Sequence, residues 1–191
     1  MSAALKPMTA EEFLAWEERQ DERYEFDGFR PIAMTGGTFA HGIIGRNVRT
    51  ELDNRLRGSR CIPLGPDMKI AVVGRFRYPD AIVVCSPVDR KATVIADPVV
   101  VFEVLSDGTA RIDHFDKLRE YTATASIRRY VLLQQDGIGA TVYVRDGDRM
   151  VVETVARGDT LRLPEIEVEI PVDDLYRGVE PEEPGATVVS G

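Results

Sequence analysis

The chain has 191 residues, of which 43% are hydrophobic, and a formal net charge of −8 at pH 7. This length accommodates one domain with a substantial core and leaves little room for a second. The apolar content argues against a disordered chain, and the acidic balance excludes nucleic-acid binding driven by overall charge alone. No apolar run approaches the length of a membrane span, and the N-terminus lacks the basic start and apolar stretch of a signal peptide. We therefore expect no membrane partner.

The chain has only two cysteines, Cys61 and Cys85, and they do not form a CxxC pair. This spacing predicts neither a disulfide framework nor a zinc site made of thiolates. A reducing cytoplasm is the setting that such cysteine usage favours.

Positive charge is concentrated in one part of this acidic chain. Residues 46–60 contain five arginines against Glu51 and Asp53. Such a run forms either a local basic surface or a solvated helix face, and the solvated helix face is the more common case.

The first third of the chain contains signals for two helices and a hairpin. Thr9 and Glu12 form a capping box, which predicts a short helix. Two short extended runs around Asp27-Gly28 predict a hairpin over residues 23–34. A longer helix is predicted over residues 41–57, because apolar side chains recur at every fourth position: Ile44, Val48, Leu52 and Leu56.

The rest of the chain is predicted to be mostly strands. We expect strands over 68–72, 80–85, 98–105 and 130–133, a helix over 110–123, a β meander through 141–144 and 150–155, and an alternating strand over 165–169. The central order of helix, three strands, helix and strand predicts an α/β (α+β) fold, with a mixed sheet between helices, an N-terminal helix and hairpin, and a C-terminal meander. One domain should span residues 1–178, followed by a disordered acidic tail over 179–191.

Two carboxylates on neighbouring predicted strands suggest a cation site. Glu103 interrupts the apolar run 99–105, where an ionised carboxylate is costly without a cation or hydrogen-bond donors. Asp80 opens the preceding central strand. Each residue alone has an ordinary alternative: a buried ion pair or a solvent-near strand end for Glu103, and a turn for Asp80. Together at one edge of a sheet they form a like-charge pair that a divalent cation would neutralise.

Other charged residues could reach the same edge. Lys117 lies on the helix that follows the Glu103 strand, although a surface pair with Asp113 at i,i+4 is its simpler interpretation. Glu25 alternates with two aromatic residues, which by itself favours simple exposure. His41 begins the long helix, where it could cap the helix, donate a hydrogen bond or contact substrate.

Several familiar chemistries have no support. The chain contains no GxSxG elbow, no P-loop and no GxGxxG after a strand, and only two histidines. A site lined by oxygen ligands would suit Mg²⁺ or Mn²⁺ rather than zinc or copper.

An ordered set of motifs resembles the Uma-type restriction endonucleases of the PD-(D/E)XK nuclease superfamily. The set spans roughly residues 9–133, and its order is more specific than any one member. It comprises Tyr24-Glu25-Phe26-Asp27-Gly28, His41, Pro79-Asp80, Glu103-Val-Leu-Ser106 with Thr109, and Asp113, Lys117 and Tyr121.

The resemblance implies a restriction-endonuclease-like core in the order αβββαβ and assigns roles to these residues. Asp80 and Glu103 would bind Mg²⁺ or Mn²⁺, Glu25 would be a further acidic catalytic residue, and Lys117 would be the catalytic cation. Supporting positions would be His41, Ser106, Thr109, Asp113 and Tyr121, with Arg46 and Arg49 as phosphate contacts. In the standard form of the superfamily the lysine stands two residues after the strand glutamate, where this chain has Leu105.

The expected function is hydrolysis of phosphodiester bonds by a metal-dependent endonuclease, with DNA as the substrate implied by the resemblance. A homodimer or a higher homo-oligomer is expected, because two symmetric sites suit the cutting of both strands of a duplex. Two alternatives remain open. The first is an inactive nucleic-acid-binding module of the same fold, suggested by Leu105. The second is an oligomeric structural or interaction protein whose acids form ion pairs.

Overall fold

The computed structural model describes residues 7–34, 36–105 and 110–179, without the side chains of residues 110–114. The tail expected over 179–191 therefore lies outside the described residues, apart from Val179. None of the helices in this part of the chain is long and apolar enough to cross a membrane.

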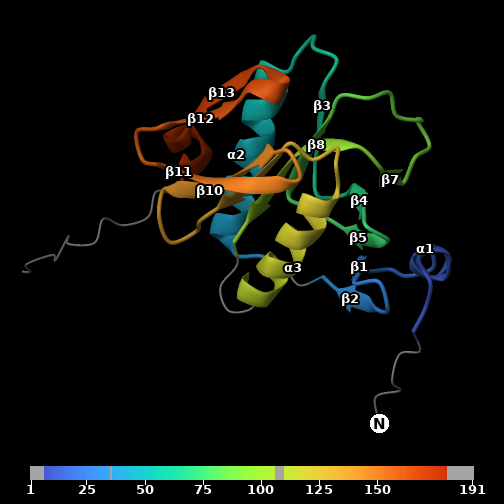
Figure 1. Ribbon diagram of the computed structural model, residues 1–191. Coiled ribbons are helices and arrows are strands. Elements are labelled where there is room, and N and C mark those ends of the chain that lie inside the picture. The colour runs from blue at the N-terminus through green and yellow to red at the C-terminus, as the bar shows by residue number, and fades with distance from the viewer. Residues whose placement is uncertain (1–6, 35, 106–109, 180–191) are drawn as a thin grey trace, which may run out of the picture.

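The strands form two larger sheets and a separate pair (Figure 1). A six-stranded sheet has the order β11-β10-β9-β8-β6-β3 and contains β3 (Ile62–Leu64), β6 (Ala81–Val84), β8 (Pro98–Val104), β9 (Arg129–Leu133), β10 (Gly139–Asp146) and β11 (Arg149–Ala156). A five-stranded sheet has the order β2-β1-β5-β4-β7 and contains β1 (Tyr24–Phe26), β2 (Pro31–Ala33), β4 (Lys69–Val72), β5 (Arg75–Arg77) and β7 (Val94–Ile95). The pair consists of β12 (Thr160–Leu163) and β13 (Val168–Pro171).

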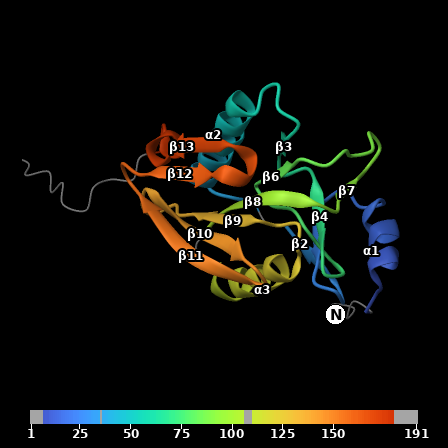
Figure 2. The same cartoon turned by 45° about the horizontal axis from the view of Figure 1, so that its top comes forward.

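The six-stranded sheet is covered on both faces. Figure 2 shows α2 (Phe39–Arg55) with β12 and β13 on one side of β8–β11, and α3 (Ala110–Ala123) on the other. Side chains alternate between two cores accordingly: Val100 and Phe102 of β8 pack with α2, whereas Val101 between them packs with α3 and β4. Because both faces are buried, the central strands need apolar residues at nearly every position, which is the pattern that identified them. Since β8 and β9 are parallel and the other neighbours antiparallel, the expected mixed sheet is confirmed.

Local sequence explains where the helices begin. Thr38 accepts a hydrogen bond from the amide of His41 and thereby starts α2, whose apolar positions Ile44, Val48 and Leu52 are buried. α1 (Ala10–Glu17) starts with the expected capping box between Thr9 and Glu12.

The N-terminal unit packs through aromatic rings. Phe13 of α1 stacks on Phe26 of β1 at a centroid distance of 4.8 Å and on Phe76 of β5 at 5.6 Å. The β1–β2 hairpin turns at Gly28, whose φ of +95° suits glycine. This small third core joins α1 and the hairpin to the five-stranded sheet.

Two details of the expected strand pattern are wrong. The strand expected over 68–72 is β4, which belongs to the five-stranded sheet, while the position beside β6 is taken by β3. The segment expected as one strand over 165–169 begins as a 3₁₀ helix, η1 (Pro164–Ile166), and becomes β13 only at Val168. A second 3₁₀ helix, η2 (Val172–Tyr176), follows. The inward-facing residues Ile166, Val168 and Ile170 are nevertheless buried as expected.

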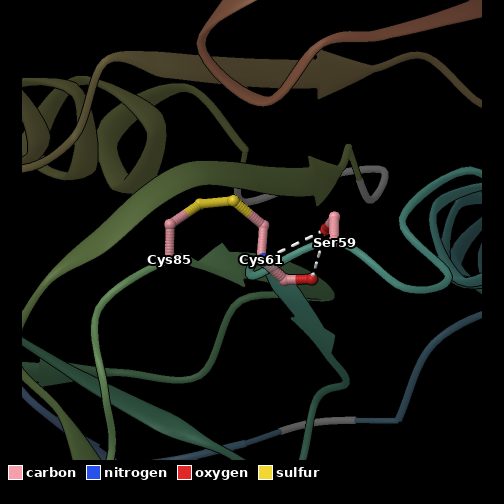
Figure 3. The surroundings of a disulfide bond; sticks show 3 residues. All are labelled: Ser59, Cys61 and Cys85. Atoms are coloured by element: carbon pink, nitrogen blue, oxygen red, sulfur yellow. Dashed lines mark hydrogen bonds between the residues drawn. A yellow bond between two sulfur atoms is a disulfide. The ribbon is translucent and has the colours of Figure 1, made fainter.

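The structure also corrects the expectation that the cysteines stay reduced. Cys61 and Cys85 form a disulfide (Figure 3). They flank the pair Ile62↔Val84 of antiparallel β3 and β6, and their Cα atoms lie 4.0 Å apart. Ser59 secures this end of β3, since its hydroxyl donates to the carbonyl of Cys61 and accepts from the amide of Cys61. The cysteine count therefore no longer supports a reducing compartment.

The cross-link makes stability dependent on redox state. We expect oxidised protein to contain no titratable thiol in denaturant. The Cys61→Ser/Cys85→Ser variant should lose about 3 kcal/mol of unfolding free energy, because the bridge joins residues 24 positions apart and so restricts the unfolded chain. Urea unfolding of wild type with and without reductant, beside the double variant, measures this. Two free thiols after incubation in an oxidising glutathione buffer would contradict the pairing.

Candidate active site

Asp80 and Glu103 lie side by side at one end of the six-stranded sheet. The antiparallel register pairs Ala81, the first residue of β6, with Phe102, so Asp80 directly before β6 lies opposite Glu103 of β8. The amide of Val104 donates to Oδ2 of Asp80 at 2.8 Å, which joins the aspartate to the strand that carries the glutamate. The expectation that two neighbouring strands each present a carboxylate at one edge is met.

The second oxygen of Asp80 is held by α2. Nε2 of His41 lies 2.7 Å from Oδ1 of Asp80, and this hydrogen bond raises the pKa of His41. Gly37 packs so closely on the imidazole that a Cβ there would lie 2.9 Å from its Cγ. Nη1 of Arg49 donates to the carbonyl of Asp80 at 3.3 Å. The first three turns of α2 therefore fix both the side chain and the main chain of this aspartate.

Glu103 is held by α3, on the face of the sheet that α3 covers. Nζ of Lys117 donates to Oε2 at 2.9 Å, and the hydroxyl of Tyr121 donates to Oε1 at 2.8 Å. Lys117 and Tyr121 are four residues apart, so a helix presents them on the same face. The lysine thus reaches the strand glutamate although Leu105 occupies the position where the superfamily usually has it.

Burial makes the charge of Glu103 costly. Burial raises its pKa to about 7, Lys117 opposes this shift, and the nearby charges of Glu25 and Asp80 add to it. Burial likewise raises the pKa of Tyr121 well above its usual value, so its hydroxyl stays a donor. A carboxylate crowded by two others in this way is stabilised by any cation that joins the group.

Glu25 is buried at the same site, so the expectation that its side chain is exposed is wrong. Its Oε2 accepts from Nη1 of Arg77 at 2.9 Å, and its Oε1 accepts from the amide of Tyr78 at 3.2 Å. Oε1 also lies 3.6 Å from Nζ of Lys117. Lys117 is therefore placed between Glu103 and Glu25.

Sequence reasoning missed two residues of this network, Arg77 and Glu120. Arg77 donates to both carboxylate oxygens of Glu120 at 2.8 and 2.7 Å while binding Glu25. Burial opposes the charge of Arg77, but the two carboxylates outweigh it and raise its pKa. Two signals could have found them: Arg75 and Arg77 alternate with Phe76 just before Pro79-Asp80, and Glu120 lies three residues after Lys117 on α3.

Other expected residues do not join the described site. Arg46 is exposed, and its side chain donates to Oδ1 of Asn47 rather than to a residue of the acidic site. Ser106 and Thr109 lie outside the described residues, and the side chain of Asp113 does too, so its pairing with Lys117 stays a prediction.

The carboxylates of Asp80 and Glu103 are suitable ligands for a hard divalent cation. Among the described residues, no group of three or more Asp, Glu, His or Cys side chains is arranged to hold a metal. Asp80 and Glu103 offer two carboxylates, and each oxygen keeps a second lone pair beside its present hydrogen bond. Mg²⁺ commonly binds through one or two carboxylates, with water and substrate phosphate completing its shell. The chemistry of these two side chains therefore fits Mg²⁺ or Mn²⁺.

A cavity of about 810 Å³ lies elsewhere, between α3, the β4–β5 turn and the β10–β11 hairpin. Its lining includes Arg75 and Glu120 but neither Asp80 nor Glu103. Ion pairs run from Arg75 of this lining through Glu120 to Arg77 and from Arg77 to Glu25.

Two curated proteins are similar to this chain over most of its length. An "Uncharacterized protein slr1290" of Synechocystis sp. (strain ATCC 27184 / PCC 6803 / Kazusa) is 36% identical over 183 residues, covering 93% of this chain and 96% of the relative. The "Uncharacterized protein sll1609" of the same strain is 26% identical over 166 residues, covering 84% of this chain and 94% of the relative.

A solved structure shares the fold. The crystal structure of "a putative nuclease belonging to DUF820" from Anabaena variabilis ATCC 29413 superposes with a TM-score of 0.75 at 15% identity, covering 89% of this chain and 98% of that one. The model of the Uma2 family, described as "Putative restriction endonuclease", matches residues 10–173, a span that contains every element of the acidic site described above. The chain therefore belongs to the Uma2 family of restriction-endonuclease-like proteins.

Proposed function

We propose that this chain is a divalent-metal-dependent endonuclease that hydrolyses phosphodiester bonds of DNA. The observation that carries the proposal is the juxtaposition of Asp80 and Glu103 on adjacent strands with Lys117 on the glutamate. Membership of the Uma2 family supports a nucleic acid as the substrate class.

In this proposal Asp80 and Glu103 hold the cation through their carboxylates. A bound Mg²⁺ or Mn²⁺ supplies Lewis acidity toward a phosphate oxygen and lowers the pKa of bound water. His41 and the amide of Val104 orient Asp80, and Tyr121 orients Glu103, so the chain fixes the direction of both ligands before a cation arrives.

Lys117 is the positive charge beside the phosphate. Its ammonium group donates to Glu103 at 2.9 Å and lies 3.6 Å from Glu25, so its positive charge is placed beside the proposed cation site, where it stabilises charge that develops on the phosphate or orients the attacking water. Glu25 lies on the other side of the ammonium group, and Arg77 and Glu120 hold Glu25 in place. We therefore assign Glu25 to positioning Lys117 rather than to a second metal.

The expected partners follow from the same chemistry. Arg49 lies beside the main chain of Asp80, and Arg46 lies one turn earlier on α2, so both are proposed contacts for phosphates that flank the reacting one. We also propose a homodimer, because two sites can cut both strands of a duplex.

A second candidate is favoured by the ion pairs themselves. Lys117 neutralises Glu103, and Arg77 neutralises Glu25 and Glu120, so these acids could form a structural network in a protein that binds nucleic acid without cutting it. Cleavage assays with matched variants separate the two candidates.

Cleavage should require the two acids and the lysine. We expect Mn²⁺- or Mg²⁺-dependent cutting in a screen of plasmid, linear, single-stranded and branched DNA, and a loss of at least about 100-fold in rate for Asp80→Asn, Glu103→Gln and Lys117→Ala. Glu169→Gln is the matched control, because that carboxylate is exposed and pairs only with Arg162 among the described residues. Specific DNA binding with no cutting by folded wild type would favour the binding module.

Protonation of Glu103 should appear in the stability of the metal-free protein. Its pKa is about 7 in the folded chain against 4.5 as the unperturbed value. Between these pH values the folded state holds a proton that the unfolded state has released, so stability falls as pH rises through this window and levels off above it. Relative to Glu103→Gln, wild type should lose up to roughly 3 kcal/mol between pH 4.5 and pH 8.

Urea unfolding in the presence of a chelator at several pH values measures this difference. Taking the difference between wild type and Glu103→Gln removes the contribution of groups that titrate equally in both. Parallel stability profiles for the two proteins would show that Glu103 has the same pKa in the folded and unfolded chain. Burial and the charges of Asp80 and Glu25 would then not raise it.

A further inference from the structure

β11 is an open edge of the six-stranded sheet. Within the described part of the chain it pairs with β10 alone, and it is the outermost strand of the sheet in Figure 2. Its eight residues are largely exposed, including the apolar side chains of Val151 (44% exposed) and Val152 (58%). An edge strand of this kind presents unpaired N–H and C=O groups together with apolar side chains, which favours pairing with another strand.

The other edges of the two large sheets are protected by their shortness. β3 and β2 have three residues each, and β7 has two. Short edge strands are a common way to prevent edge-to-edge association. Among the described sheet edges, only β11 combines length with exposed apolar residues.

The sequence of β11 is complementary to itself when two copies run antiparallel. A two-fold axis at Val151 places Arg149 opposite Glu153 of the other copy, and Glu153 opposite its Arg149. Because side chains alternate along a strand, Arg149, Val151 and Glu153 share one face. On the other face Met150 lies opposite Val152. Every one of these cross-strand pairs is either oppositely charged or apolar.

We propose that two copies of this chain associate by antiparallel pairing of β11 with β11, in the register that places Val151 on the two-fold axis. The two six-stranded sheets then form one continuous sheet across the dimer, and the symmetry generates the Arg149–Glu153 and Met150–Val152 pairs twice, whereas Val151 meets its own copy once on the axis. The inference specifies the surface of the homodimer proposed above. The association is measured on the protein alone, without metal or nucleic acid. A protein that stays monomeric would therefore not contradict the nuclease proposal, and a protein that does not cut DNA would not contradict the dimer.

The contacts of Arg149 and Glu153 within their own chain leave both side chains able to pair with a second copy. Arg149 is 79% exposed in its side chain and, among the described residues, its side chain bonds only Asp146 of its own hairpin, at 3.2 Å. Glu153 is 62% exposed in its side chain and lies 4.0 Å from the buried Arg129. Arg129 keeps its two hydrogen bonds to Glu165 when Glu153 turns to a partner strand, so the rearrangement leaves no buried charge unpaired.

Sedimentation velocity over a range of protein concentrations tests the interface. Wild type should form a dimer, and Arg149→Glu or Glu153→Arg should each weaken it by at least about tenfold, because each places like charges opposite each other twice. The double variant Arg149→Glu/Glu153→Arg should regain wild-type affinity, since it restores opposite charges in the same register.

Val151→Lys provides an independent test, because it places two ammonium groups on the two-fold axis and should give a monomer. Val88→Lys, at an apolar residue of similar exposure far from β11 in the sequence, is its matched control and should leave the dimer unchanged. Thermal unfolding of every variant checks that its fold is intact. A wild type that stays monomeric at all concentrations, a dimer that tolerates Val151→Lys, or a double variant no better than the single ones would overturn the proposal.

Discussion

The Glu103 carboxylate lies inside a sheet that is apolar on both faces, next to a second carboxylate, Asp80, on the neighbouring strand. Burial and like charge both oppose its ionisation and raise its pKa to about 7. Such a group costs stability unless hydrogen-bond donors and cations surround it. The two helices provide these groups. Lys117 and Tyr121 of α3 bind Glu103, and His41 of α2 binds the neighbouring Asp80.

The requirement extends beyond the acids. Lys117 sits between Glu103 and Glu25, Glu25 is bound by Arg77, and Arg77 is bound by Glu120 of α3. This alternation of charge links β8, α3, β1 and β5, so it also attaches the five-stranded sheet to the six-stranded one. Function and architecture are therefore coupled, since removing one member leaves its partners buried and unpaired. A structural network and a catalytic site are compatible here, because the groups that stabilise the acids also orient them.

Sequence patterns predicted the three helices and the central strands β6, β8 and β9, but they missed the short strands β3, β5, β7 and β12 and what depends on pairing between distant segments. The helix over 110–123 was predicted with the bounds that the structure has, and the two acids follow from a charge within an apolar strand. The disulfide was missed because it depends on the register of β3 against β6, and β3 has only three residues, one of them proline. Arg77 was missed because an arginine in a short strand normally reads as exposed, and only the tertiary fold brings Glu25 and Glu120 to it.

Calorimetric titration of Mn²⁺ into the metal-free protein tests the central claim, that Asp80 and Glu103 together form a cation site. Folded wild type should bind the metal, and Asp80→Asn and Glu103→Gln should each lose roughly tenfold or more in affinity, while Glu169→Gln binds as wild type does. Circular dichroism of each variant establishes that it is folded. No binding at millimolar Mn²⁺, or equal binding by all four proteins, would contradict the account and leave the acids as members of a structural ion-pair network.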